Sequence, residues 1–217
     1  MFRRSGSLAT FFIDGQLPSP AGADFGAALA RRRFRSIENA AAEQSSIGWV
    51  TPNDPSGDSF AAEDMRCGDH WWLRARIDKK TLPAAWVAIH RAAAERSAGR
   101  PLRAREKREL REGLERSLLP RVLPAVRFVD VLYAEESKLL LLFSTARGVQ
   151  EEFAKLMRLT FEVHLEAATP HRLAQDVGLA ADQRQRLDEL SPVRWTRPRS
   201  SAIARPSTES LALEVDS

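Results

Sequence analysis

The amino-acid sequence predicts an α/β (α+β) fold made of two split βαβ-like halves, with a long helical hairpin inserted between them. Three observations support this prediction. Strand-like runs alternate with stretches of helical periodicity on both sides of residues 83–123. Residues 83–123 themselves contain two helical patterns, separated by Gly99-Arg100-Pro101. With 43% hydrophobic and 29% charged residues, the 217-residue chain has the composition of a globular protein.

The first part of the α/β core covers residues 7–82. Its expected elements are a strand over 8–13, an amphipathic helix over 24–35, a short strand over 47–50, a loop over 51–58 and a strand over 71–77. Asp78-Lys79-Lys80 is expected to be the polar exit of the last strand, because it follows an alternating apolar run.

The second part of the core covers residues 124–171. Its expected elements are strands over 126–133 and 138–143 around a turn at Glu135-Glu136, a helix over 149–159 and a strand over 160–165. Residues 172–190 are expected to form a short helical extension. Residues 191–217 mix Pro, Ser and charged residues, which predicts a disordered tail, basic first and acidic last.

Two consecutive helices are expected in the hairpin, over 83–98 and about 103–119. The first has one apolar stripe, formed by Trp86, Ile89 and Ala93. Thr81 is a candidate N-cap for it, and Gly99 and Pro101 end it. The second helix is charged over most of its circumference and has only a thin apolar stripe, formed by Leu110, Leu114 and Leu118.

Four tryptophans, Trp49, Trp71, Trp72 and Trp86, are candidates for base stacking. Three of the four occupy strand or helix positions flanked by apolar residues, which favours packing in the core. Trp71 and Trp72 are consecutive in a strand and cannot share a face, so one of them is expected to be more exposed. Trp195 lies in the tail and is a candidate for stacking on a base or a partner.

The hairpin concentrates positive charge. Residues 91–121 contain ten basic and five acidic side chains, a net charge of +5, against +4 for the whole chain. Charged helix faces are usually only solvated, and Glu–Arg pairs at i,i+4 account for part of the pattern. At the tip, however, five bases are offset only by Glu106, and such a surface suits DNA backbone phosphates. The candidate DNA-contacting residues are Arg96, Arg100, Arg103, Arg105, Lys107, Arg108, Arg111, Arg116 and Arg121.

Three short motifs occur in order around this layout: Gly48-Trp49-Val50, Leu82-Pro83 and Ser117 to Arg121. From about Ser7 to His171 the chain thereby resembles the RdgC family of bacterial recombination-associated proteins. The resemblance implies an α/β protein that pairs into a ring around duplex DNA, with little sequence preference. It also implies a role in restraining strand exchange, with the basic hairpin lining or closing the ring.

The chain departs from the family pattern in two places. Typical members continue through a further domain after the strand that ends near Leu165, whereas a short helix and a tail follow here. An open dimer with a single interface is therefore expected in place of a closed ring. Arg105 stands where relatives often have a helix-capping threonine, so the second hairpin helix is expected to fray at its start.

A homodimer is expected from the apolar residues at the base of the hairpin. The Leu110/Leu114/Leu118 stripe is too thin to bury much surface within its own hairpin. A second subunit related by a two-fold axis would cover the neighbouring apolar residues, and the candidate interface is Leu119, Val122 and Leu123.

Enzyme-like patterns are weak. Asp130, Glu136 and Lys138 imitate the acidic-x-lysine pattern of metal-dependent nucleases, but a polar hairpin turn explains them better. Gly57-Asp58-Ser59 lies in a Pro/Gly loop and is interpreted as a turn, not as a hydrolase nucleophile. The four histidines lack metal-ligand spacing, and no Gly-rich phosphate loop is present. The sequence predicts no catalytic residue, metal site or cofactor.

Composition completes the prediction. A net charge of +4 agrees with an anionic partner, and a lone Cys67 fits a reducing compartment. The apolar runs are too short for a signal peptide or a membrane span. The expected protein is cytoplasmic and nucleoid-associated, binds DNA (duplex, without sequence preference) and meets recombination proteins but no membrane. The alternatives are a protein-interaction module of the same fold that has lost DNA binding and, more remotely, a metal-dependent nuclease.

Overall fold

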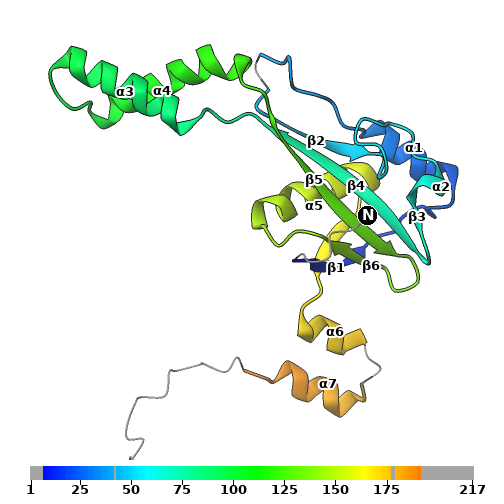
Figure 1. Ribbon diagram of the computed structural model, residues 1–217. Helices are drawn as coiled ribbons and strands as arrows, with labels where there is room; N and C mark the ends of the chain where they lie inside the picture. Colours follow the sequence, from blue (N-terminus) through cyan, green and yellow to red (C-terminus); the bar gives the residue numbers. More distant parts are fainter. Residues whose placement is uncertain (1–6, 42, 177–178, 192–217) are drawn as a thin grey trace, which may run out of the picture. The chain divides into compact units, whose positions relative to one another are not determined.

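The computed structural model describes residues 7–41, 43–176 and 179–191 (Figure 1). The chain divides into two compact units, Met1–Pro170 and His171–Ser217. The first unit contains an antiparallel sheet, two helices that cover one face of it, and the helical hairpin. The predicted α+β fold class with an inserted hairpin is thereby confirmed.

Seven strands of the described residues form one sheet, in the order β2-β4-β5-β6-β1-β7, with β3 paired to β4. The strands are β1 (Ala9–Asp14), β2 (Ser45–Val50), β3 (Arg66–Cys67), β4 (His70–Lys79), β5 (Ala125–Ala134), β6 (Leu139–Leu142) and β7 (His164–Ala167). Strands β6 and β7 are parallel to each other and flank β1, so β6, helix α5 (Arg147–Phe161) and β7 form a split βαβ unit. The connection from β1 through helix α1 (Ala23–Arg31) to β2 is wider, because three strands lie between them.

The core lies between the sheet and the two helices α1 and α5. Phe25 of α1 stacks on Phe161 of α5 with ring centroids 4.8 Å apart, so the two helices meet over the same face of the sheet. Trp49 of β2 is buried against Phe153 and Phe161. Its indole N–H donates to the Thr160 hydroxyl (2.9 Å), which donates in turn to the Leu156 carbonyl (2.7 Å). The Gly-Trp-Val motif therefore anchors the edge of the sheet to α5.

Helix α5 is longer than the sequence predicted, and the strand expected over 160–165 is wrong in its first part. Phe153, Leu156, Met157, Thr160 and Phe161 recur with helical spacing and are all buried. This packing outweighs the local strand preference of Thr160 and Phe161. The helix ends at Glu162, which adopts a left-handed conformation (φ 61°), and β7 begins at His164.

Helix α1 is shorter than the predicted 24–35. It ends at Arg31 because the following backbone turns to pair with β2: the Phe34 N–H donates to the Trp49 carbonyl (2.8 Å) and the Trp49 N–H to the Arg32 carbonyl (3.0 Å). The short helix α2 (Ala62–Met65) and strand β3 were not predicted.

The second unit contains two described helices. Helix α6 (Pro170–Asp176) begins two residues before the helical extension expected over 172–190, and α7 (Ala181–Asp188) lies inside it. The predicted disordered tail lies outside the described residues except for Ser191, and Trp195 lies outside them entirely. Within the described part of the chain, no helix has the length and apolar character needed to cross a membrane.

Candidate nucleic-acid interface

The helical hairpin is inserted at the end of the longest ladder in the sheet. Strands β4 and β5 pair over nine residue pairs, and the last pair is Lys79 with Ala125. The chain leaves the sheet there, forms α3 (Ala84–Ala98) and α4 (Ala104–Leu118), passes through the 3-10 turn η1 (Leu119–Arg121) and returns. Figure 1 shows the two helices side by side, beyond the ends of the two strands. No residue of α3 or α4, both of which the structure describes in full, belongs to the hydrophobic core cluster of the sheet.

The ends of the two helices follow the sequence prediction only in part. Gly99 ends α3 in the left-handed conformation (φ 65°), as predicted. Thr81 does not cap α3, because the helix begins after Pro83 and has no side-chain cap.

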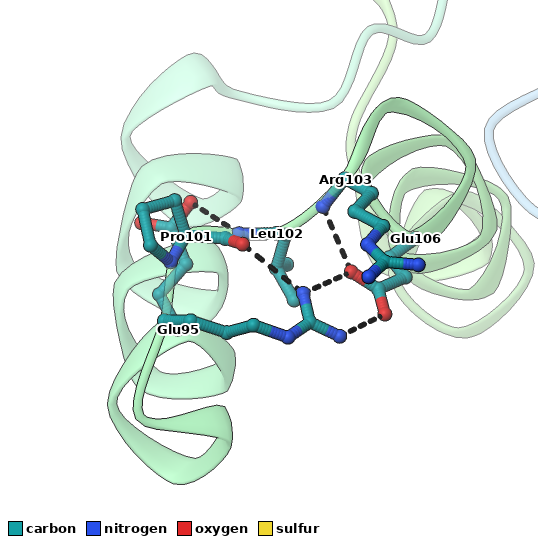
Figure 2. A network of polar contacts seen from close by, with 6 residues as sticks. Glu95, Pro101, Leu102, Arg103 and Glu106 are labelled. Carbon is teal, nitrogen blue, oxygen red and sulfur yellow. Dashed lines mark hydrogen bonds and ion pairs between the residues drawn. The ribbon is translucent and has the colours of Figure 1, made fainter.

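Helix α4 is fastened at its start, so the predicted fraying at Arg105 is wrong. The N-cap is Arg103, whose backbone N–H donates to Glu106 Oε2 (2.8 Å). Figure 2 shows this carboxylate between Arg103 and the turn, where Arg100 donates to it through two guanidinium nitrogens (2.9 and 2.7 Å). On the other side of the turn, the Leu102 N–H donates to Glu95 Oε1 (3.2 Å).

These contacts have a clear electrostatic effect on the tip. The Arg100 guanidinium and the Arg103 N–H stabilise the ionised Glu106 carboxylate and lower its pKa to about 2. The same bonds raise the pKa of Arg100. The single acid at the tip therefore holds the turn in place, and it also neutralises one of the candidate DNA-contacting arginines.

Every glutamate of the hairpin pairs with an arginine. The pairs are Glu95–Arg91 (3.2 Å), Glu106–Arg100 (2.7 Å), Glu109–Arg105 (2.8 Å), Glu112–Arg108 (3.7 Å) and Glu115–Arg111 (3.0 Å). All five pairs are at least partly exposed, and four of them are i,i+4 contacts along one helix. Exposed pairs of this kind contribute only about 0.3–0.5 kcal/mol each, so a phosphate could displace the glutamate at small cost.

Five bases of the hairpin form no ion pair among the described residues, and they carry its net positive charge. They are Arg96, Arg103, Lys107, Arg116 and Arg121, which we call the unpaired bases. The first three lie near the turn between the helices, and the last two lie near the sheet. Arg116 Nε donates to a backbone carbonyl, that of Glu112 (3.3 Å), and so keeps its charge uncompensated. All five were among the nine candidates taken from the sequence.

A buried polar cluster fixes the point where the chain leaves the sheet. Asp78 is fully buried and accepts two bonds from Arg76 (both 2.8 Å), which raise the pKa of Arg76. The Lys80 side chain is only 3% exposed, and its ammonium donates to the carbonyls of Glu38 (3.0 Å) and Ala40 (2.8 Å). The sequence predicted a polar exit of the strand at 78–80 but did not predict that Asp78 and Lys80 are buried. The sequence feature that could have predicted this ion pair is the spacing of Arg76 and Asp78, which are two residues apart and therefore lie on the same face of the strand.

The candidate dimer residues differ in how much surface they present. Leu119 is buried within its own chain and Val122 is half-buried, so both have little area to offer a second subunit. Leu123 is 73% exposed. Val126 and Phe128, at the start of β5, are exposed as well, and the guanidinium of Arg74 lies over the Phe128 ring. Leu123 is thus the most accessible of the three.

The four tryptophans differ in how far they are buried. Trp49 and Trp71 are buried, and Trp72 is the more exposed of the consecutive pair. Trp86 is 53% exposed on α3 and is therefore the one of the four that lies outside the core. The stripe to which it belongs does not face the core, because α3 contacts the rest of the hairpin through other residues.

The nuclease-like residues have structural partners or lie in turns. Asp130 accepts bonds from Trp72 Nε1 (2.9 Å) and Arg74 Nε (2.6 Å) in the middle of the sheet. Glu136 and Lys138 lie in the exposed turn between β5 and β6. Asp58 of the Gly-Asp-Ser loop pairs with Arg33 (3.2 Å). Among the residues that the structure describes, no three His, Cys, Asp or Glu side chains are grouped so as to hold a metal ion.

Comparison with known families gives one match. The family model described as "Putative exonuclease, RdgC" matches residues 7–177, which include the whole sheet, both core helices and the hairpin. A search of curated proteins returned no match.

Proposed function

The chain belongs to the RdgC family of recombination-associated DNA-binding proteins, and on this basis we propose that it binds duplex DNA without sequence preference through the helical hairpin. The observation that carries the proposal is the set of unpaired bases, Arg96, Arg103, Lys107, Arg116 and Arg121. Arg and Lys side chains that have no carboxylate partner are free to release counterions from phosphates, which is the main source of sequence-independent affinity.

The paired arginines extend this surface. Arg105 and Arg108 are largely exposed, and their glutamate partners are held by contacts that solvent weakens. Arg100 is different, because Glu106 holds it through two bonds and also caps α4. In this proposal the paired arginines rank below the unpaired bases, and Arg100 serves the shape of the tip.

We propose further that the protein is a homodimer, with Leu123 and the exposed residues beside it at the interface. A large exposed leucine next to Val126 and Phe128 gives an apolar surface that a two-fold partner would bury. A dimer would place two basic hairpins on one DNA molecule. Binding to chromosomal DNA would locate the protein in the cytoplasm at the nucleoid, where recombination proteins are its expected partners.

The experiment that tests DNA binding uses two duplexes of unrelated sequence and the full chain. Anisotropy titrations from low to physiological salt should give equal affinities for both duplexes and a steep salt dependence. Charge reversal at Arg103, Arg105 and Arg108 to Glu should abolish binding while circular dichroism and the melting curve stay unchanged. No binding at low salt by the wild-type protein would favour the alternative, a protein-interaction module of the same fold.

The exonuclease in the family's description needs its own test. Incubation of linear or nicked DNA with Mg²⁺ or Mn²⁺ should leave the DNA intact, because Asp130 is engaged by Trp72 and Arg74. Degradation that requires the metal and is lost in Glu136→Gln would support a nuclease instead.

A further inference from the structure

Helix α3 exposes an apolar stripe that its own chain does not cover. Trp86 is 53% and Ile89 57% exposed, and Ala93 continues the stripe one turn further along. No residue of α3 is buried, although all fifteen are described. The helix contacts the hairpin through half-buried residues on another side, among them Val87 and Ala94. Exposed apolar surface of this kind on a helix is typical of an interaction site.

The stripe has a defined electrostatic character. The single acid of α3, Glu95, is paired with Arg91 and bonded to the Leu102 N–H, and it lies away from the stripe by helical spacing. Arg96, one of the unpaired bases, follows Ala93 on the same face. Along the helix, the stripe therefore presents two large apolar side chains, then a small one, then a basic one. It belongs to the helical hairpin, whose residues 83–123 carry a net charge of +5.

We propose that this stripe, Trp86, Ile89, Ala93 and Arg96, docks an acidic amphipathic helix of a partner protein. Anchors at i, i+3 and i+7 are the spacing at which one helix packs against another. Ala93 lets a partner helix approach closely, and Trp86 and Ile89 supply the large side chains that dominate interface affinity. Arg96 and the charge of the hairpin favour carboxylates on the flanks of the partner helix.

Two other occupants fit the observations less well. A second copy of the chain on this stripe would bring together two segments that each carry a net charge of +5. A nucleic-acid base would stack on Trp86, but Ile89 and Ala93 would then stay uncovered. An acidic helix covers all three apolar residues and also compensates the charge.

The proposal is tested with the full chain and a designed peptide, in the absence of DNA. The peptide is a labelled helix with Leu at i, i+3 and i+7 and Glu on both flanks. Fluorescence anisotropy should show saturable binding that Trp86→Ala weakens at least about tenfold. The control variant Leu159→Ala changes another exposed apolar residue, on α5, and should bind as the wild type does. The same peptide with Lys in place of Glu, and a scrambled acidic peptide, should not bind.

Each other outcome overturns the proposal. Equal binding of the acidic and the scrambled peptide would show charge attraction alone. Concentration-dependent self-association that is lost in Trp86→Ala would assign the stripe to a second copy, and a loss of single-stranded DNA binding in that variant would assign it to bases. Trp86 is 53% exposed and its ring lies 6.2 Å from that of His90 on the same helix, so the variant loses no core contact and should keep a melting temperature close to that of the wild type. A normal peptide affinity in Trp86→Ala would also exclude the stripe, whether or not the hairpin binds DNA.

Discussion

Arg103 and Lys107 lie four residues apart at the start of α4, and neither forms an ion pair among the described residues. The variant Arg103→Gln/Lys107→Gln removes both charges and keeps a polar side chain at each position. If the five unpaired bases each neutralise one phosphate, log K against log salt should slope about −4.5 for the wild type and about −2.7 for the variant. Since each contact adds about 0.9 log unit at 0.1 M salt, Kd should rise roughly 60-fold in the variant.

The assay is fluorescence anisotropy on a labelled duplex at four or more salt concentrations, with two matched controls. Arg184→Gln/Arg186→Gln removes the same charge from exposed positions of α7, outside the hairpin, and should leave the slope near the wild-type value. Arg105→Gln/Glu109→Gln removes an ion pair from α4 without changing the net charge, and should also have little effect. A similar loss in the α7 control would mean that net charge decides binding. An unchanged slope in Arg103→Gln/Lys107→Gln would place the DNA elsewhere.

Three further predictions follow from the site. The Glu106 carboxyl should titrate near pH 2, so its hold on the tip is complete above its usual pKa of 4.5 and is lost as the pH falls from there to about 2; a carboxyl NMR titration with a midpoint near 4.5 would contradict this. Lys80→Met should destabilise the protein by about 2–3 kcal/mol, because the carbonyls of Glu38 and Ala40 lose the charged donor that the buried Lys80 supplies. Thermal melting should show this against the exposed neighbour Lys79→Met, and equal melting temperatures would refute it. Leu123→Asp should shift a dimer toward monomer in size-exclusion chromatography and weaken DNA binding with it; a wild-type protein that is monomeric at tens of micromolar yet binds DNA would oppose the dimer.

The order of helices and strands could be predicted from the sequence because periodicity is local. Alternation identified β4, and the Gly99 stop identified the end of α3. The predictions were wrong where contacts with a segment distant in the sequence determine the secondary structure. Thr160 has a strand preference, but its hydroxyl is bonded in the core and the helix continues through it.

The details of the site could not be predicted for the same reason, because they depend on contacts between side chains and segments that local periodicity does not describe. The basic character of the hairpin is visible in composition, but which bases stay unpaired depends on the rotamers of five glutamates. The burial of Lys80 depends on the carbonyls of residues 38 and 40, about forty positions away in sequence. The exposure of Trp86 follows from the direction in which α3 faces α4, and a single helical pattern does not specify that direction.

The hairpin is inserted between two strands that are paired up to the point of insertion, so it can be replaced without changing the sheet. Lys79 and Ala125 are partners in the ladder, so the two ends of the insertion lie about 5 Å apart, as in any antiparallel pair. A tight two-residue turn spans such a gap, which means that the sheet does not need residues 83–122 to close. The hairpin can therefore be lengthened, shortened or transplanted without a change of register in β4 and β5. A chain in which a short turn replaces 83–122 and Lys80 is kept would be a folded scaffold for grafting hairpins with other charge patterns.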